Sequence, residues 1–188
     1  MNTWITSDWH FNHTNICGPK VSRWGSGYRT FDNVPQMNST IFDNINKLVK
    51  EDDTIYFLGD FCFGDHRKTP EHRSRIVCKN IHLIRGNHDE NIDTYKDHFS
   101  SINDVLMINQ GKRKIFLSHY SHRVWPGSHK GTIHLYGHSH SSIPDFGKSM
   151  DVGIDAAYRL FKEYRPFHID EIYGIMDKKE IEVVDHHA

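Results

Sequence analysis

The chain contains the stretch Thr54-Ile-Tyr-Phe-Leu-Gly-Asp60, a nearly continuous apolar run that ends in a glycine and a carboxylate. Such a run, without polar alternation, is typical of a parallel β-strand that is buried on both faces. Before it, residues 37–49 have the apolar spacing of an amphipathic helix, and Pro35 suits the first turn of that helix. After it, the pattern predicts a helix over 69–79 and a strand over 81–84. Strands that alternate with helices indicate an α/β fold.

Four other short apolar runs end in polar side chains in the same way. They lead into Ser7-Asp8-Trp9-His10, Gly86-Asn87-His88-Asp89, Ser118-His119 and Gly137-His138-Ser139-His140. Because α/β sheets place their sites beyond the carboxyl ends of strands, we expect these side chains to meet. The remaining pattern predicts strands over 4–6, 105–108, 114–117, 132–136, 150–154 and 181–184, with short helices over 92–99 and from about residue 170.

The composition limits the partners that the protein can have. With 188 residues the chain is the size of one domain, which we place at residues 1–188. The formal net charge is -1, so the sequence predicts no extended basic surface for nucleic acid. The chain has 16 His, more than packing or solubility requires, and we expect several of them to bind something. The oligomeric state is not predicted.

The cysteines and the hydropathy indicate a cytoplasmic protein. The three Cys are odd in number and lack CxxC spacing, which favours free, buried thiols over a disulfide framework. No apolar stretch approaches the roughly 20 residues that span a bilayer, and the N-terminus lacks the features of a signal peptide. We therefore expect no membrane association and a reducing compartment.

The polar residues at the strand ends have the chemistry of a metal site. Asp, Asn and His together suit borderline divalent ions, whereas Mg²⁺ prefers oxygen ligands and structural zinc prefers Cys. Two Asp, one Asn and four His are more ligands than one ion takes, and they suffice for two ions if one carboxylate bridges. Two such ions can activate water and neutralise phosphate oxygens.

The ordered motifs DxH, GD, GNH[DE], a lone His and GHxH resemble the signature of the calcineurin-like metallophosphoesterases. The resemblance covers roughly the N-terminal three quarters of the chain. It implies an α/β fold of the metallophosphoesterase type, a β-sandwich flanked by helices in four layers (αββα). It also implies a hydrolase of phosphate esters with two divalent metal ions. Mn²⁺ is the expected ion, and Fe, Zn²⁺, Co²⁺ and Ni²⁺ accept the same ligands.

The resemblance assigns roles to individual positions. The implied metal ligands are Asp8, His10 and His140 for the first ion, Asp60 as the bridge, and Asn87, His119 and His138 for the second ion. His88 would be catalytic, either protonating the leaving oxygen or stabilising the transferring phosphoryl group. Many family members carry an Asp that orients this His, but the position is Phe63 here. Asp65 or Asp89 could replace it, and the sequence leaves that choice open.

Substrate contacts are predicted less sharply than the ligands. His13, Arg85 and His122 flank the motifs and are possible substrate contacts. A long loop is predicted over 11–35, and we expect it to help bind the substrate. Six aromatics could stack a nucleobase, although core or loop packing is their commoner role: Trp9, Phe11, Trp24, Tyr28, Tyr120 and Trp125. The expected partner is a small phosphate ester of nucleotide type, with monoester and diester both open. The alternatives are a phosphoprotein phosphatase and a catalytically silent binding scaffold.

Overall fold

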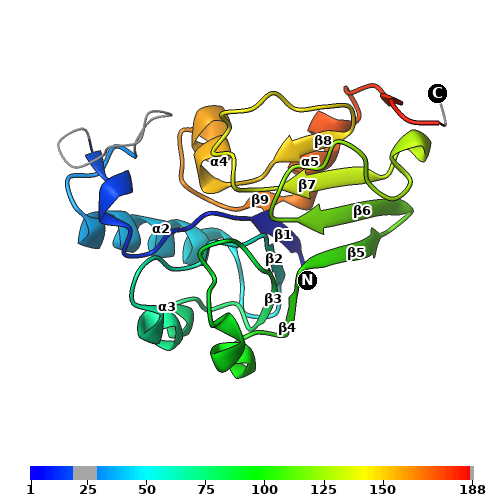
Figure 1. The fold of residues 1–188 in the computed structure, drawn as a ribbon. Coiled ribbons are helices and arrows are strands. Elements are labelled where there is room, and N and C mark those ends of the chain that lie inside the picture. The colour runs from blue at the N-terminus through cyan, green and yellow to red at the C-terminus, as the bar shows by residue number, and fades with distance from the viewer. Residues whose placement is uncertain (19–28, 187–188) are drawn as a thin grey trace.

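Two β-sheets form the centre of the molecule, with helices beside them (Figure 1). This computed structural model describes residues 1–18 and 29–186. The first sheet, in the order β4-β3-β2-β1-β9, consists of β1 (Thr3–Thr6), β2 (Thr54–Phe57), β3 (Asn80–Ile84), β4 (Ser101–Asn103) and β9 (Phe167–His168). The second sheet, in the order β5-β6-β7-β8, consists of β5 (Val105–Gln110), β6 (Arg113–Ser118), β7 (Ile133–Tyr136) and β8 (Ser149–Asp151).

The helices lie on the flanks of this sandwich. The α-helices are α2 (Val34–Leu48), α3 (Thr69–Ser74), α4 (Ile154–Phe161) and α5 (Ile169–Met176). Short 3-10 helices are η1 (Thr14–Ile16), η2 (His66–Lys68), η3 (Ile92–His98) and η4 (Ser128–Lys130). Figure 1 shows α2 and α3 beside the first sheet and α4 near β7 and β8. The α/β fold of two sheets flanked by helices is therefore confirmed.

Strand direction brings the motifs to one region. β1, β2, β3 and β4 run parallel, and only β9 is antiparallel to its neighbour in the described part of this sheet. In the second sheet β6, β7 and β8 run parallel. The carboxyl ends of β1, β2 and β3 therefore lie at one edge of the first sheet, and those of β6 and β7 lie at one edge of the second.

The core has two layers because the central strands are buried on both faces. Ile55 and Phe57 pack with Ile41 of α2 on one face of the first sheet. Leu58 and Ile84 pack with residues of the second sheet on the other face. Alternate side chains of a strand point to opposite faces, so an apolar run without alternation fills both layers. The predicted double burial of the 54–58 run is confirmed.

Several predicted elements differ from the structure. The helix predicted over 69–79 ends at Ser74, where the buried Arg73 binds the carbonyl oxygens of Ile76 and Cys78 and turns the chain into β3. The strand predicted over 150–154 ends at Asp151, and Ile154 instead begins α4, which the sequence did not predict. Residues 181–184 form no strand, so that prediction is wrong. The short β4 and β9 were not predicted either.

Two further observations concern the cysteines and the membrane. Cys17, Cys62 and Cys78 are all free and buried, which confirms that prediction. Over residues 1–18 and 29–186, no helix has the length and apolar character needed to cross a bilayer.

Candidate metal centre

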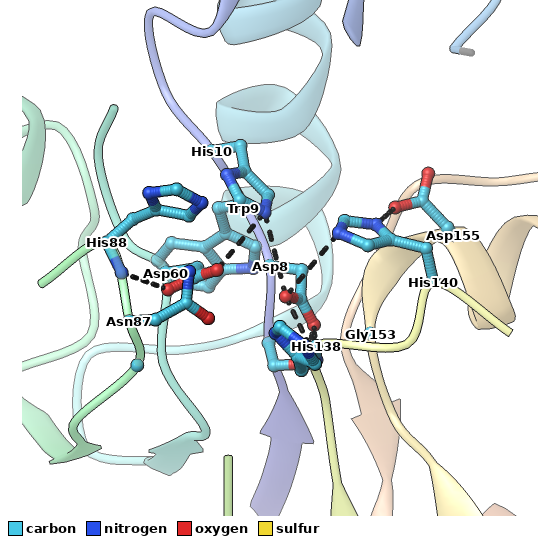
Figure 2. A network of polar contacts seen from close by, with 12 residues as sticks. Asp8, Trp9, His10, Asp60, Asn87, His88, His138, His140, Gly153 and Asp155 are labelled. Carbon is cyan, nitrogen blue, oxygen red and sulfur yellow. Dashed lines mark hydrogen bonds and ion pairs between the residues drawn. The ribbon is translucent and has the colours of Figure 1, made fainter. Parts of the chain in front are cut away.

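The five motif turns meet at the junction of the two sheets. The turn after β1 is joined to the turn after β2, because the N–H of Asp8 donates to the carbonyl of Gly59 at 2.9 Å and that of His10 to the carbonyl of Asp60 at 3.0 Å. The turns after β6 and β7 are joined by the N–H of Gly137 and the carbonyl of His119, at 2.9 Å. These links hold side chains from distant parts of the chain around one space (Figure 2).

A first group of three ligands comes from the turns after β1 and β7. It consists of Asp8, His10 and His140, whose donor atoms lie within 4.8 Å of one another. Nε2 of His10 is 3.6 Å from Oδ1 of Asp8, and Nε2 of His140 is 3.8 Å from the same oxygen. Asp8 and His10 are buried, and the His140 side chain is 10% exposed. The group has the donors and the spacing for one divalent cation.

A second group lies beside the first and is more open to solvent. It consists of Asp60, His119 and His138, again with donor atoms within 4.8 Å of one another, and His138 is exposed. The Asn87 side-chain oxygen lies 3.0 Å from Nε2 of His119, so the amide belongs to this group. Asp60 Oδ2 lies 3.5 Å from Nε2 of His119 and 3.5 Å from Nε2 of His10. One carboxylate oxygen therefore lies between the two groups, as the predicted bridging role requires.

The backbone at these ligands is held in an uncommon conformation. Five of the seven have positive φ angles: Asp8 (57°), His10 (50°), Asp60 (63°), His138 (63°) and His140 (46°). Residues with a side chain rarely adopt this left-handed region, and they keep it only where surrounding contacts impose it. Such concentration of strain is typical of functional sites.

The glycines in the motifs are required by close approach. Gly59 has φ +97°, and a Cβ there would lie 2.6 Å from Nδ1 of His119. A Cβ on Gly137 would lie 2.5 Å from Oδ2 of Asp8. Neither turn can therefore bring its ligand into place with a larger residue beside it.

The charges in the centre compete with one another. Burial and the nearby Asp8 raise the pKa of Asp60 to about 7, although His119 opposes the shift. For Asp8, burial alone would raise the pKa, but the hydrogen bond with His10 and the neighbouring imidazoles hold it well below its usual range. Burial lowers the pKa of His10 to about 3. Asp8 and Asp60 are two buried carboxylates that raise the cost of each other's charge, and added positive charge would stabilise both, so the residues fit divalent cations.

Buried partners orient the ligands. The Asp8 carboxylate accepts the backbone N–H of His138 at 3.0 and 3.1 Å and the hydroxyl of Ser7. Nδ1 of His119 faces the Leu58 carbonyl at 2.7 Å, and Nδ1 of His140 faces Asp155 at 2.7 Å. Both imidazoles therefore turn Nε2 toward the centre, the arrangement in which a second partner orients a metal-ligating His.

His88 lies at the edge of the centre, and neither proposed carboxylate orients it. Its backbone N–H donates to Asp60 at 2.8 Å, and burial lowers the pKa of its imidazole. The Asp89 carboxylate instead accepts the backbone N–H groups of Asp60, Phe61 and Gly86 at 2.8 to 3.0 Å.

Asp65 pairs with Arg67 on the surface, at 2.8 Å. Neither Asp65 nor Asp89 therefore orients His88. The His88 ring instead contacts Phe63 edge-on, with 4.9 Å between ring centroids. Asp89 holds the turn that carries Asp60.

The predicted substrate contacts divide between two hollows. His13 stacks on Phe63, with 3.7 Å between ring centroids, and both line a hollow of about 390 Å³. Arg85 and His122 line another hollow of about 260 Å³ together with Asn87, His119 and Tyr120. Arg85 is also paired with Asp93 and Asp104. Trp24 and Tyr28 lie outside the described residues. A larger hollow of about 810 Å³, at the amino ends of β6 and β7, contains none of the predicted site residues.

Three polar residues at the centre were missed from the sequence. Asp155 supports His140, Asp151 holds the turn after β7 through Ser139 and the N–H of Ser141, and Arg29 binds Asp155. None belongs to a motif. A local signal for them was absent, since the Arg29–Asp155 contact joins positions 126 residues apart.

A two-sheet α/β fold with carboxylate and imidazole groups at its strand ends is the architecture of a metal-dependent phosphoesterase. The chain belongs to the calcineurin-like phosphoesterase family, whose model matches residues 1–188. The resemblance seen in the five motifs is confirmed.

Two relatives and one solved structure match most of the length of this chain. An uncharacterized protein of Methanocaldococcus jannaschii is 27% identical over 186 residues, which cover 95% of this chain and 93% of the relative. The Gene 66 protein of Mycobacterium phage L5 is 25% identical over 209 residues, with 94% of each chain covered. A protein of unknown function from Aquifex aeolicus shares the fold, with a TM-score of 0.65, 22% identity and coverage of 93% of this chain and 98% of that one.

Proposed function

We propose that the protein hydrolyses small phosphate esters with two divalent cations, Mn²⁺ being the expected ion. The observation that carries this proposal is the position of Asp60, whose Oδ2 lies 3.5 Å from an imidazole nitrogen of each ligand group. A single oxygen shared in this way suits a pair of ions better than two independent sites. When bound, such a pair supplies charge for the phosphate oxygens and lowers the pKa of water.

The residues of the chain divide the remaining work. Asp8, His10 and His140 would hold one ion, and Asn87, His119 and His138 the other, with Asp60 shared. His88 would donate its imidazole N–H to the transferring phosphoryl group or to the leaving oxygen. Its position supports this role, because its backbone is anchored on Asp60 and its ring lies 5.5 Å from that of His10. We propose a positioning role for Asp89, through the backbone of the Gly59-Asp60 turn, in place of a catalytic one.

The two hollows favour a phosphodiester over a monoester. A diester has two substituents on phosphorus, and a separate hollow adjoins the motif turns for each of them. The first is lined by the stacked His13 and Phe63, and the second by Tyr120, which lies 4.6 Å from the His138 ring. Aromatic faces of this kind can stack a nucleobase, which supports small nucleotide-type esters as substrates.

A substrate panel tests the proposal. The chain loaded with Mn²⁺ is assayed on an aryl phosphate, a bis-aryl phosphate, cyclic nucleotides and a phosphopeptide. We expect the highest kcat/KM on the diesters, and a loss of about 100-fold or more, about 2.7 kcal/mol, for Asp60→Asn. Asp177→Asn is the matched control, since Asp177 is a surface carboxylate that pairs with Arg113, away from the motif turns.

Three results would contradict parts of the proposal. Preference for the phosphopeptide would favour a phosphoprotein phosphatase. Mn²⁺ binding without turnover would favour a binding scaffold. Equal activity of Asp60→Asn and Asp177→Asn would show that Asp60 takes no part in the reaction.

A further inference from the structure

Arg29 is a buried arginine outside all five motifs. Only 1% of its surface is exposed. Its backbone pairs with the segment after η1, because its N–H donates to the Ile16 carbonyl at 2.8 Å and its carbonyl accepts the N–H of Gly18 at 2.8 Å. This pairing fixes the Arg29 backbone and directs the side chain under the turn after β1.

The guanidinium makes a two-pronged pair with Asp155. Nε donates to Oδ1 at 2.9 Å, and Nη2 donates to Oδ2 at 2.8 Å. Oδ2 of Asp155 is also the atom that faces Nδ1 of His140 at 2.7 Å (Figure 2). Arg29 therefore acts on the side chain of one ligand of the first group through a single intervening carboxylate.

The same guanidinium also holds the backbone of the other two ligands. Nη2 donates to the carbonyl of Asp8 at 2.5 Å, and Nη1 donates to the carbonyl of Trp9 at 2.8 Å. These carbonyls lie between the Cα atoms of Asp8 and His10, where both φ angles are positive. The bonds stabilise a backbone conformation that L-residues seldom adopt.

Arg29 uses all of its donors in this position. A fifth contact runs from Nη1 to the sulfur of Met37, at 3.7 Å. A planar fork of five N–H groups can satisfy two carbonyls and a carboxylate at once, whereas the ammonium of Lys has three donors on a flexible stem. Burial would lower the pKa of Arg29, but the charge of Asp155 raises it, so the guanidinium stays charged in the core.

The second ligand group has different support. Nδ1 of His119 faces the carbonyl of Leu58, and the Asp60 turn is held by Asp89. None of the five donor contacts of Arg29 reaches a residue of this group. A change at Arg29 should therefore affect the two groups unequally.

We propose that Arg29, acting with Asp155, is a positioning residue for the first metal group. One guanidinium clamps the backbone of Asp8 and His10 and, through Asp155, the ring of His140. The inference rests on the proposed function, since it presumes metal in that group. It assigns part of the 11–35 loop, predicted from the sequence to serve the substrate, to the assembly of the metal site.

The test is a Mn²⁺ titration of the full-length chain after its metal has been removed with a chelator. Binding is measured by calorimetry and by the electron paramagnetic resonance signal of free Mn²⁺. Wild type should bind two equivalents. Arg29→Lys should weaken one class of site by 10- to 100-fold and leave the other within about twofold, the usual effect of losing an outer partner of a ligand. Asp155→Asn should weaken the same class, and the double variant should add little, because both changes remove one connected network.

Arg165→Lys is the matched control. Arg165 is also buried and also makes a two-pronged pair, with Glu171 at 2.7 and 2.9 Å, but its remaining bonds go to Pro166 and Glu163. It should lower the unfolding temperature and leave both Mn²⁺ classes unchanged. A general loss of packing would instead reduce metal binding in the control as well, which would overturn the inference.

The outcomes separate this inference from the proposed function. If Arg29→Lys and Asp155→Asn both bind two Mn²⁺ with wild-type affinity, the inference is wrong and the phosphoesterase proposal stands. If wild type binds two Mn²⁺ but hydrolyses no ester, the proposed function is wrong, while selective weakening in the variants would still support the clamp. Should Arg29→Lys fail to fold, Asp155→Asn decides alone, since it keeps the shape of the side chain.

Discussion

Acid should destabilise the protein through His134, a buried histidine on the strand that leads to His138 and His140. His134 is fully buried, and burial lowers its pKa to about 4. Its Nε2 accepts the backbone N–H of His122 at 3.0 Å, and its Nδ1 faces the carbonyl of Phe116 at 3.3 Å. The neutral ring thus accepts at Nε2, and a proton there would face another donor.

The magnitude follows from the two pKa values. Because the folded-state pKa lies below the unfolded value of 6.5, the unfolded chain binds the proton first, so stability is lost as the pH falls from about 6.5 toward about 4. At pH 5 the loss from this one group is about 2 kcal/mol relative to pH 8. His134→Phe keeps a ring in the same space but cannot bind a proton.

The assay is urea unfolding at pH 8 and at pH 5 in the presence of chelator. His134→Phe should be less stable at pH 8, since it leaves the N–H of His122 without its acceptor. Its difference between the two pH values should be smaller than that of wild type by about 2 kcal/mol. His98→Phe, at an exposed position, should leave the wild-type difference intact. An unchanged pH difference in His134→Phe would refute the reasoning.

The other predictions concern the metal centre. Gly59→Ala should cost more than about 2 kcal/mol of stability and abolish metal binding, because its Cβ would lie 2.6 Å from Nδ1 of His119. The control variant is Gly111→Ala, which also has a positive φ but has open space around it. It should cost only about 1 kcal/mol of stability. Equal unfolding temperatures for the two variants would contradict this. Phe63→Asp would place a carboxylate beside His88 and raise the pKa of that imidazole, so the pH profile of kcat should shift to higher pH. An unchanged profile would exclude a proton-transfer role for His88. Chelation should lower the unfolding temperature of wild type, and Mn²⁺ at about 100 times its Kd should restore about 2.7 kcal/mol, measured by thermal unfolding with and without the ion.

Much of the fold could be predicted because its signals are local. The run over 54–58 and the amphipathic pattern of α2 each specify an element from neighbouring residues, and both are confirmed. The missed strands β4 and β9 have three and two residues, too few to show a period. Residues 181–184 have strand-like side chains, but in the structure they pair with no strand, and a strand forms only where a neighbour accepts its hydrogen bonds.

In the candidate site, too, the features with local sequence signals could be predicted and the long-range contacts could not. In two motifs the ligand directly follows the glycine that its turn requires: Gly59 precedes Asp60, and Gly137 precedes His138. The ligand and the turn that presents it could therefore be predicted from neighbouring residues. The orienting partner of His88 could not be predicted, since it depended on which way Asp65 and Asp89 point. One pairs with Arg67, and the other binds backbone.

The sequence by itself therefore determined the donors, their order and the turns that present them. Only the tertiary structure decided how the donors are held: the shared position of Asp60 between the two groups, and the clamp of Arg29 through Asp155. The physical reason is the distance along the sequence over which each interaction acts. A turn is specified by its own few residues, whereas a buried ion pair between positions 126 residues apart exists only once the fold has brought Arg29 and Asp155 of α4 together.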